Sequence, residues 1–208
     1  MIYPQKNKIV SWFFHNYILY IVKRNFKRIN YNTPGLDKDR SVLLLANHYS
    51  WWDGFLMYYI NYKLFKKRFY IMVMEETMQQ VSFFKYMGAF SVNKKSREML
   101  HSLNYAAELL NDPENLVLIF PQGKLYSNFT DSVKFEQGLA RIIKGATGKF
   151  QMIFAASFIE SFQYKKPTVT IYVKPETGLH PDEKVDEIQK AYQQYYNSAK
   201  LLQTEIVI

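Results

Sequence analysis

Short apolar runs alternate along the chain with longer segments in which apolar residues recur at helical spacing. The apolar runs predict buried strands at residues 41–47, 69–74, 89–92, 115–120, 151–158 and 168–173. The helical spacing predicts helices at residues 52–64, 76–86, 96–110, 138–146 and 181–201. Because strands that are apolar throughout are buried on both faces, the pattern predicts an α/β fold with a mostly parallel central sheet flanked by helices.

An apolar and aromatic stretch at residues 9–22 comes before the first of these strands and is followed by a basic cluster. A helix of about 14 residues is roughly 21 Å long, which is too short to cross a hydrocarbon core of about 30 Å. A signal peptide has its basic residues before the apolar run, so that assignment fits poorly. Two interpretations remain, namely an ordinary helix packed on the domain, or an amphipathic helix at a membrane interface. In the second interpretation, residues 1–32 form the interface helix, residues 33–208 form one α/β domain, and the lipid contacts are Trp12, Phe13, Phe14 and Tyr17.

The composition excludes some kinds of catalytic chemistry and indicates the charge of the partner. The 208 residues include no cysteine, which excludes disulfides and a cysteine nucleophile. The net charge of +9 comes mainly from residues 1–40 and 61–100, so an anionic partner is expected. Phospholipid headgroups or a phosphorylated carrier suit this charge. Nucleic acid is not expected as a partner, because the sequence has no recognition motif and its aromatic residues lie in apolar segments.

A histidine follows the first strand of the predicted domain, in the stretch Asn47-His48, and Asp53 lies five residues further on. A carboxylate on one ring nitrogen orients an imidazole and stabilises its protonated form, so the pair has the spacing of a general base with its orienting group. The alternative is a polar break between strand and helix, with Asp53 stabilising the helix N-terminus. Without a GxSxG motif or a cysteine, the base would act on a hydroxyl or amine of the substrate. No metal site is expected, because the other histidines lie on unrelated segments.

A second group of polar residues follows the strand at residues 115–120. Pro121, Gln122 and Gly123 form a turn with backbone N–H groups, and Lys124 adds a positive charge. Such a turn can hold an oxyanion or a phosphate, although a plain Pro-Gly turn has the same sequence. The carboxyl ends of parallel strands meet at one edge of a sheet, so we expect this turn to share a crevice with His48.

These blocks together resemble the glycerophospholipid acyltransferase superfamily, which includes the lysophosphatidic acid acyltransferases. Asn47, His48 and Asp53 match its first motif, an Asn-His pair followed after four residues by Asp. Residues 88–94 and 120–127 are similar to its second and third motifs, and the Lys-Phe-x-x-Gly that follows is present at residues 134–138.

The resemblance implies acyl transfer from a thioester donor, acyl-CoA or acyl carrier protein, to a hydroxyl of a lysophosphatidate-like membrane lipid. His48 would be the general base and Asp53 its orienting carboxylate. No cofactor is implied beyond the acyl donor, and the protein would work as a peripheral enzyme on the cytoplasmic face of a membrane. The substrate contacts that it implies are Asn47, Lys94, Gln122, Gly123 and Lys124.

The sequence departs from the family pattern where the family binds the acceptor's phosphate. Gln122 replaces a glutamate, and Leu125 and Lys94 replace arginines, whose bidentate geometry a lysine does not reproduce. Three hypotheses follow for the acceptor. It is a lysophosphatidate-like lipid, or a lipid without phosphate such as a lyso-aminolipid or glycolipid, or the protein only binds lipid and is catalytically idle.

Overall fold

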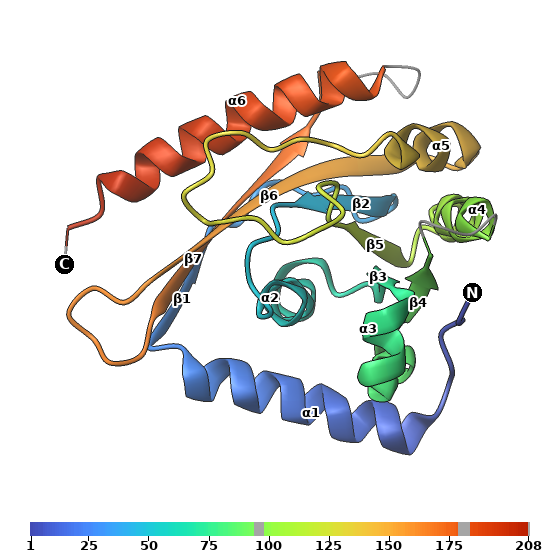
Figure 1. The fold of residues 1–208 in the computed structure, drawn as a ribbon, viewed down its shortest axis with the longest axis horizontal. Coiled ribbons are helices and arrows are strands. Elements are labelled where there is room, and N and C mark those ends of the chain that lie inside the picture. Colours follow the sequence, from blue (N-terminus) through green and yellow to red (C-terminus); the bar gives the residue numbers. More distant parts are fainter. Residues whose placement is uncertain (94–97, 179–183, 208) are drawn as a thin grey trace.

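The computed structural model describes residues 1–93, 98–178 and 184–207, in which a seven-stranded sheet is flanked by helices (Figure 1). The strands are β1 (Arg28–Tyr31), β2 (Ser41–Ala46), β3 (Arg68–Met74), β4 (Ala89–Val92), β5 (Asn115–Ile119), β6 (Phe150–Glu160) and β7 (Thr168–Glu176). The helices are α1 (Lys8–Asn25), α2 (Asp53–Ile60), α3 (Glu75–Gln80), α4 (Met99–Leu109), α5 (Gly138–Gly145) and α6 (Val185–Thr204). A π-helix, η1 (Asn61–Phe65), extends α2, and a 3₁₀ helix, η2 (Ser82–Met87), follows α3.

The order of the strands is β1-β7-β6-β2-β5-β3-β4. Within the described residues every neighbouring pair is parallel except β6 with β7, which form an antiparallel hairpin. The predicted α/β class with a mostly parallel sheet is therefore confirmed. The sequence pattern did not distinguish the one antiparallel pair, because both of its strands are nearly as apolar as their parallel neighbours.

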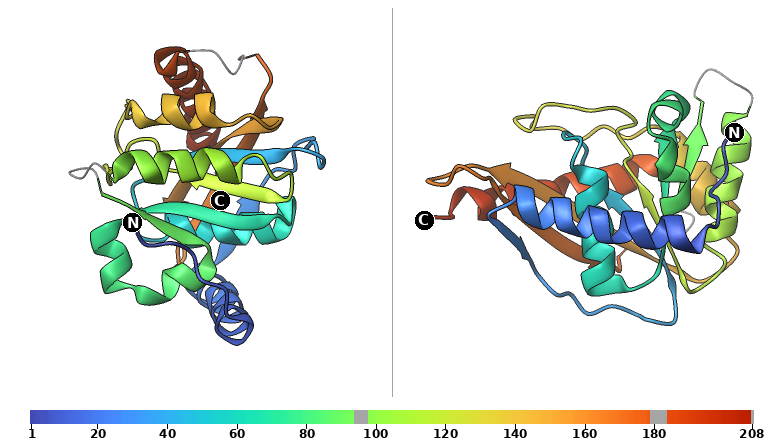
Figure 2. Two further views of the ribbon diagram at one scale, coloured as in Figure 1. Left: turned by 90° about the vertical axis from the view of Figure 1, so that its right-hand side faces the viewer. Right: turned by 90° about the horizontal axis from the view of Figure 1, so that it is seen from below.

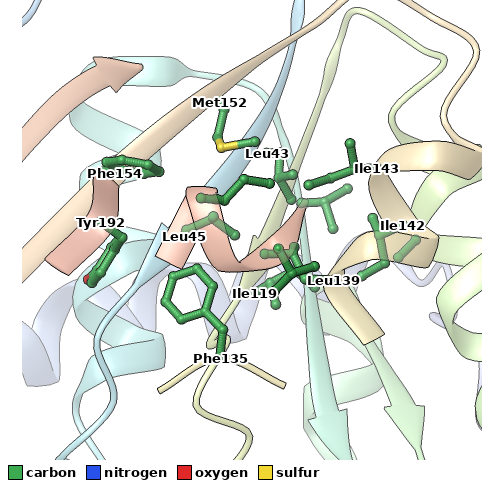
Figure 3. Close-up of a cluster of buried hydrophobic side chains, with 14 of the residues drawn as sticks. Leu43, Leu45, Ile119, Phe135, Leu139, Ile142, Ile143, Met152, Phe154 and Tyr192 are labelled. Carbon is green, nitrogen blue, oxygen red and sulfur yellow. The ribbon is translucent and has the colours of Figure 1, made fainter. Parts of the chain in front are cut away.

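Helices cover both faces of the sheet, with α1 and α2 on one face and α4, α5 and α6 on the other (Figure 1). All six residues of β2 are buried, because alternate side chains enter the two hydrophobic cores. Leu43 and Leu45 meet α5 and α6 residues such as Ile142 and Tyr192 in the core of Figure 3. Full burial of each such leucine contributes about 1.5–3 kcal/mol of transfer free energy. The central strand is thus fixed from both sides, and its carboxyl end is a rigid support for the loop that follows.

The predicted N-terminal helix is present as α1, and it packs one side on the domain. Ile18 and Val22 are buried, and the Phe14 ring stacks on Phe83 with 4.1 Å between centroids. The structure therefore places Phe14 on the inner side, apart from the other three aromatic residues predicted to contact lipid. The outer side exposes a row of large apolar residues, Ile9, Trp12, Phe13, Tyr17 and Tyr20. None of the helices in the described ranges is long and apolar enough to span a membrane.

Several elements differ from those predicted. Residues 28–31, at the end of the predicted interface segment, form edge strand β1 alongside β7, and Asn32 continues this pairing through its amide to the backbone of Val173. A segment of four residues with mixed polarity is too short to show the apolar pattern of a strand. The helix expected at residues 76–86 breaks at Val81 into α3 and η2. The last helix starts at Val185 and continues to Thr204, while its expected start at Pro181 lies outside the described residues.

Candidate active site

The two polar strand ends lie side by side at the carboxyl edge of the sheet. β2 and β5 are parallel neighbours with Leu45 opposite Ile119, so the loops that follow them leave the sheet together. The backbone N–H of Tyr126 donates to the carbonyl of His48 at 3.1 Å, which joins the two loops directly. The expected shared crevice is therefore present.

His48 and Asp53 form the predicted pair. Asp53 is the first residue of α2 and is fully buried, and its Oδ2 lies 2.9 Å from Nδ1 of His48. The same oxygen accepts the backbone N–H groups of Tyr49 and Ser50, each at 2.8 Å. One carboxylate oxygen thus holds both the histidine ring and the turn between strand and helix. With Nδ1 facing the carboxylate, Nε2 is the ring nitrogen left to act as a base.

Phe120 fixes the plane of the histidine ring. Its ring stacks on that of His48 with 4.1 Å between centroids and 12° between planes. About a quarter of the His48 side chain, 24 %, stays exposed, so the imidazole is held in place and still accessible. The sequence placed Phe120 at the end of a strand, but nothing in the pattern indicated that its ring would lie against His48.

Gln122 lies against the backbone of His48 and is 2 % exposed. Its Oε1 accepts the backbone N–H of His48 at 2.7 Å, so this predicted substrate residue contacts the loop that carries His48. Gly123 has a left-handed φ of 65°, which favours glycine, and its N–H donates to the carbonyl of Phe120 at 3.0 Å. That N–H is thus already engaged, which removes it as the expected oxyanion donor. Lys124 is exposed, its backbone N–H has no partner among the described residues, and its Nζ lies 5.3 Å from the centre of the Tyr126 ring.

The remaining predicted substrate residues lie elsewhere. Asn47 is buried, and its amide bonds the backbone of Ser157 on β6, donating to the carbonyl at 3.1 Å and accepting from the N–H at 2.8 Å. It therefore ties the end of β2 to its neighbour instead of facing the crevice. Lys94 lies outside the described residues.

A mostly apolar cavity of about 800 Å³ opens beside His48. Side chains from both faces of the sheet line it, including Phe55, Ile71, Met72, Leu103 and Leu139. Its polar lining includes His48, Thr77, Lys124, Glu136 and Gln137. The last two come from the segment at residues 134–138, whose part in the cavity wall the sequence did not reveal. The cavity has the size and lining of a site for a largely apolar ligand.

The site therefore combines an imidazole that a buried carboxylate orients with an adjoining cavity for a largely apolar ligand, so it can take a proton from a group on such a ligand. The chain belongs to the acyltransferase family, whose sequence model matches residues 23–173. This match confirms the resemblance to the glycerophospholipid acyltransferase superfamily.

Among solved structures, the fold is similar to that of PlsC, the 1-acyl-sn-glycerophosphate (LPA) acyltransferase from Thermotoga maritima. The TM-score is 0.67 at 16% sequence identity, and the alignment covers 95% of this chain and 83% of that chain. The likeness at this identity concerns the fold. Comparison of the sequence with curated proteins gives no match.

Proposed function

We propose that this acyltransferase moves a fatty acyl group from acyl-CoA or acyl carrier protein to a hydroxyl of a lysophosphatidate-like lipid, with His48 as general base. The activity would be that of a 1-acylglycerol-3-phosphate O-acyltransferase. The observation that carries the proposal is the position of the imidazole. Its Nδ1 is held by buried Asp53, and its ring borders a cavity of about 800 Å³ lined mainly by apolar side chains.

In the proposed reaction, Nε2 of His48 takes the proton of the acceptor hydroxyl while that oxygen attacks the thioester carbonyl carbon. The tetrahedral oxyanion needs hydrogen-bond donors, and the backbone N–H and ammonium of Lys124 are two candidates at this turn. Collapse breaks the carbon–sulfur bond, and the imidazolium returns the proton to the departing thiolate. A thiol pKa near 8.5 makes that thiolate a good leaving group.

The cavity is the proposed place for the acyl chain. Apolar residues line it on both sides of β3, such as Phe69 and Ile71 toward α2 and Met72 toward α4. Burying each methylene of an acyl chain there contributes about 0.8 kcal/mol, so chains of several methylenes gain substantial binding energy.

The acceptor's headgroup is proposed to lie at the mouth of the cavity, near Lys124. Lysine binds phosphate as a point charge, which supports a phosphate-bearing acceptor. A second candidate is an acceptor without phosphate, because no arginine lines the cavity in the described part of the chain and Gln122 is neutral. Both candidates use the same chemistry at His48.

We also propose that the protein binds the cytoplasmic face of a membrane as a peripheral protein. The exposed row on α1 supports this, since Trp12 is 68 % exposed and Phe13 is 55 % exposed. Aromatic side chains with nearby lysines and arginines are typical of helices that lie at a lipid interface.

Mass spectrometry of the products tests the proposal. The purified protein is given acyl-CoA or acyl carrier protein, with matched acceptors that differ only in a phosphomonoester. Acylated lysophosphatidate formed at catalytic turnover is the expected product. Efficient acylation of the phosphate-free acceptor alone would favour the second candidate. No acylated product with any donor and acceptor would contradict acyl transfer and leave a protein that only binds lipid.

A further inference from the structure

A second cavity, of about 1090 Å³, lies at the opposite edge of the sheet from His48. It is bordered by the start of α1, the segment around η1, and the beginnings of β3 and β4. The right-hand view of Figure 2 shows α1 beside the segment that follows α2, and His15 contacts the Tyr62 ring across them at 5.3 Å between centroids. The two cavities adjoin, since Tyr58, Phe69 and Met87 line both. Arg68 at the start of β3 lines only this cavity, whereas His48 and Met74, at the end of β3, line only the other.

The lining of this cavity is strongly basic. Six of its described residues are lysine or arginine, and none is aspartate or glutamate. Two of the six already have partners, since Lys67 donates to the carbonyls of Lys38 and Pro113 and Arg68 pairs with Asp112 outside the cavity. Lys63 lies over the Tyr59 and Tyr62 rings. No acidic side chain among the described residues pairs with the remaining three, Lys6, Lys8 and Lys66.

The helix dipole of α1 adds to this positive charge, and the turn at Lys66 has a defined backbone conformation. The N-terminus of α1 carries the positive end of the helix dipole, yet its first turn contains no acidic residue and its flanking side chains are Lys6 and Lys8. Lys66 has a left-handed φ of 55°, unusual for a residue other than glycine. Buried Asn61 holds this turn, because its amide bonds both the carbonyl and the N–H of Lys67. Positive groups that line one cavity repel one another, and a bound anion lowers that repulsion.

We propose that this basic cavity binds a phosphate-bearing ligand at a site separate from the catalytic centre. Lysines combined with a helix N-terminus form the usual chemistry of a phosphate site. The volume exceeds that of a free phosphate ion and fits a phosphate ester. Two sources offer this group, a soluble sugar or glycerol phosphate, and the headgroup of an anionic phospholipid in the surface that the exposed row on α1 would contact.

The test compares two triple variants with equal charge. In the first, Lys6, Lys8 and Lys66 are changed to glutamine. In the control, Lys144, Lys149 and Lys190, which are exposed on other parts of the molecule, are changed to glutamine. Circular dichroism checks that both fold. Glycerol 3-phosphate is titrated by calorimetry, and binding is measured by sedimentation with vesicles of phosphatidylcholine alone or mixed with phosphatidylglycerol.

The cavity variant is expected to lose at least ten-fold in affinity for glycerol 3-phosphate or for the anionic vesicles, while the control stays within about two-fold of wild type. Loss with glycerol 3-phosphate identifies a soluble ligand, and loss with anionic vesicles alone identifies the lipid headgroup. Equal weakening of both variants would show attraction by net charge only and would overturn the proposal. So would binding that survives in the cavity variant and is lost in Lys124→Gln, because the phosphate would then sit at the catalytic centre.

Discussion

The Oε1 atom of Gln122 accepts a hydrogen bond from the backbone N–H of His48 at 2.7 Å, and the glutamine side chain is almost completely buried. The loop after β5 therefore supports the backbone of the loop after β2, while Asp53 holds the ring of the same histidine. Gln122, which the resemblance implied as a substrate contact, thus bonds the backbone of the proposed base. Through this hydrogen bond Gln122 can position His48 without any contact to the acceptor lipid.

Replacing Gln122 with alanine should lower kcat about 10- to 100-fold, because His48 loses one of the contacts that hold it in position. The unpaired His48 N–H should also lower the free energy of unfolding by about 1–3 kcal/mol. Gln122→Glu keeps an acceptor oxygen at the same position and should retain most of the wild-type kcat and most of the free energy of unfolding. Steady-state kinetics and urea denaturation measure the two effects. If Gln122→Ala raised only KM and left kcat and stability unchanged, a substrate contact would be the better explanation.

Asp53→Asn should preserve the shape of the site and lower kcat by about 10²- to 10⁴-fold. An amide cannot stabilise the imidazolium as a carboxylate does, and its NH₂ group can face Nδ1 and favour the wrong tautomer. KM for the thioester donor should change much less, since Asp53 is fully buried and does not line the cavity. Acyl-transfer kinetics with the donor varied would separate the two constants. A kcat equal to that of wild type would show that His48 needs no orienting carboxylate.

Membrane binding is best tested by surface substitutions on α1. Deleting residues 1–28 would also remove Ile18, Val22 and Phe26, which are buried, and the start of β1, so the truncated chain would lose part of its core. Trp12→Gln with Phe13→Gln changes exposed side chains only and should reduce sedimentation with lipid vesicles several-fold.

The matched control for this surface is Leu201→Gln with Leu202→Gln on α6, where both leucines are more than half exposed. This control should sediment like wild type. Should the α6 pair reduce binding and the α1 pair leave it intact, the membrane-facing surface would have to be reassigned.

His15 gives the stability a pH dependence of known sign. Burial lowers the pKa of His15 below its usual value of 6.5, and its Nδ1 lies 2.9 Å from the hydroxyl of Tyr58, whose own pKa burial raises to about 12. The unfolded chain therefore binds a proton at His15 more readily than the folded chain. The contribution of His15 is fully present above about pH 6.5 and is lost as the pH falls through the lower folded value.

Urea denaturation at a series of pH values checks this effect. The free energy of unfolding of wild type should fall more steeply below about pH 6.5 than that of His15→Gln, which has no proton to gain. Parallel curves for the two proteins would mean that His15 titrates alike in both states.

The sequence predicted the features that depend on local pattern and missed those that depend on packing across the sheet. Apolar runs such as β2 and β5 were found, and parallel pairing then placed His48 beside the Gln122 turn. The stacking of Phe120 on His48, by contrast, depends on the directions of two loops, which no periodicity encodes. Edge strand β1 was missed because it is short and half exposed.

The role of Asn47 shows the same limit. The family resemblance implied a substrate contact for Asn47, yet its amide bonds Ser157 on a strand more than a hundred residues away in sequence. The lining of the basic cavity comes from the start of α1, from η1 and from β3. The composition therefore showed an excess of positive charge, but only the fold shows that these residues meet at one cavity.

The acyl-transfer rate of His48→Ala tests the central claim most directly. The variant should fold as wild type does by circular dichroism and thermal melting, since about a quarter of the side chain is exposed and its backbone contact to Gln122 is independent of the imidazole. With a thioester donor and a lysophosphatidate acceptor, its kcat is predicted to fall by about 10²- to 10⁴-fold. Undiminished acyl transfer by the folded variant would contradict the assignment of His48 as the general base.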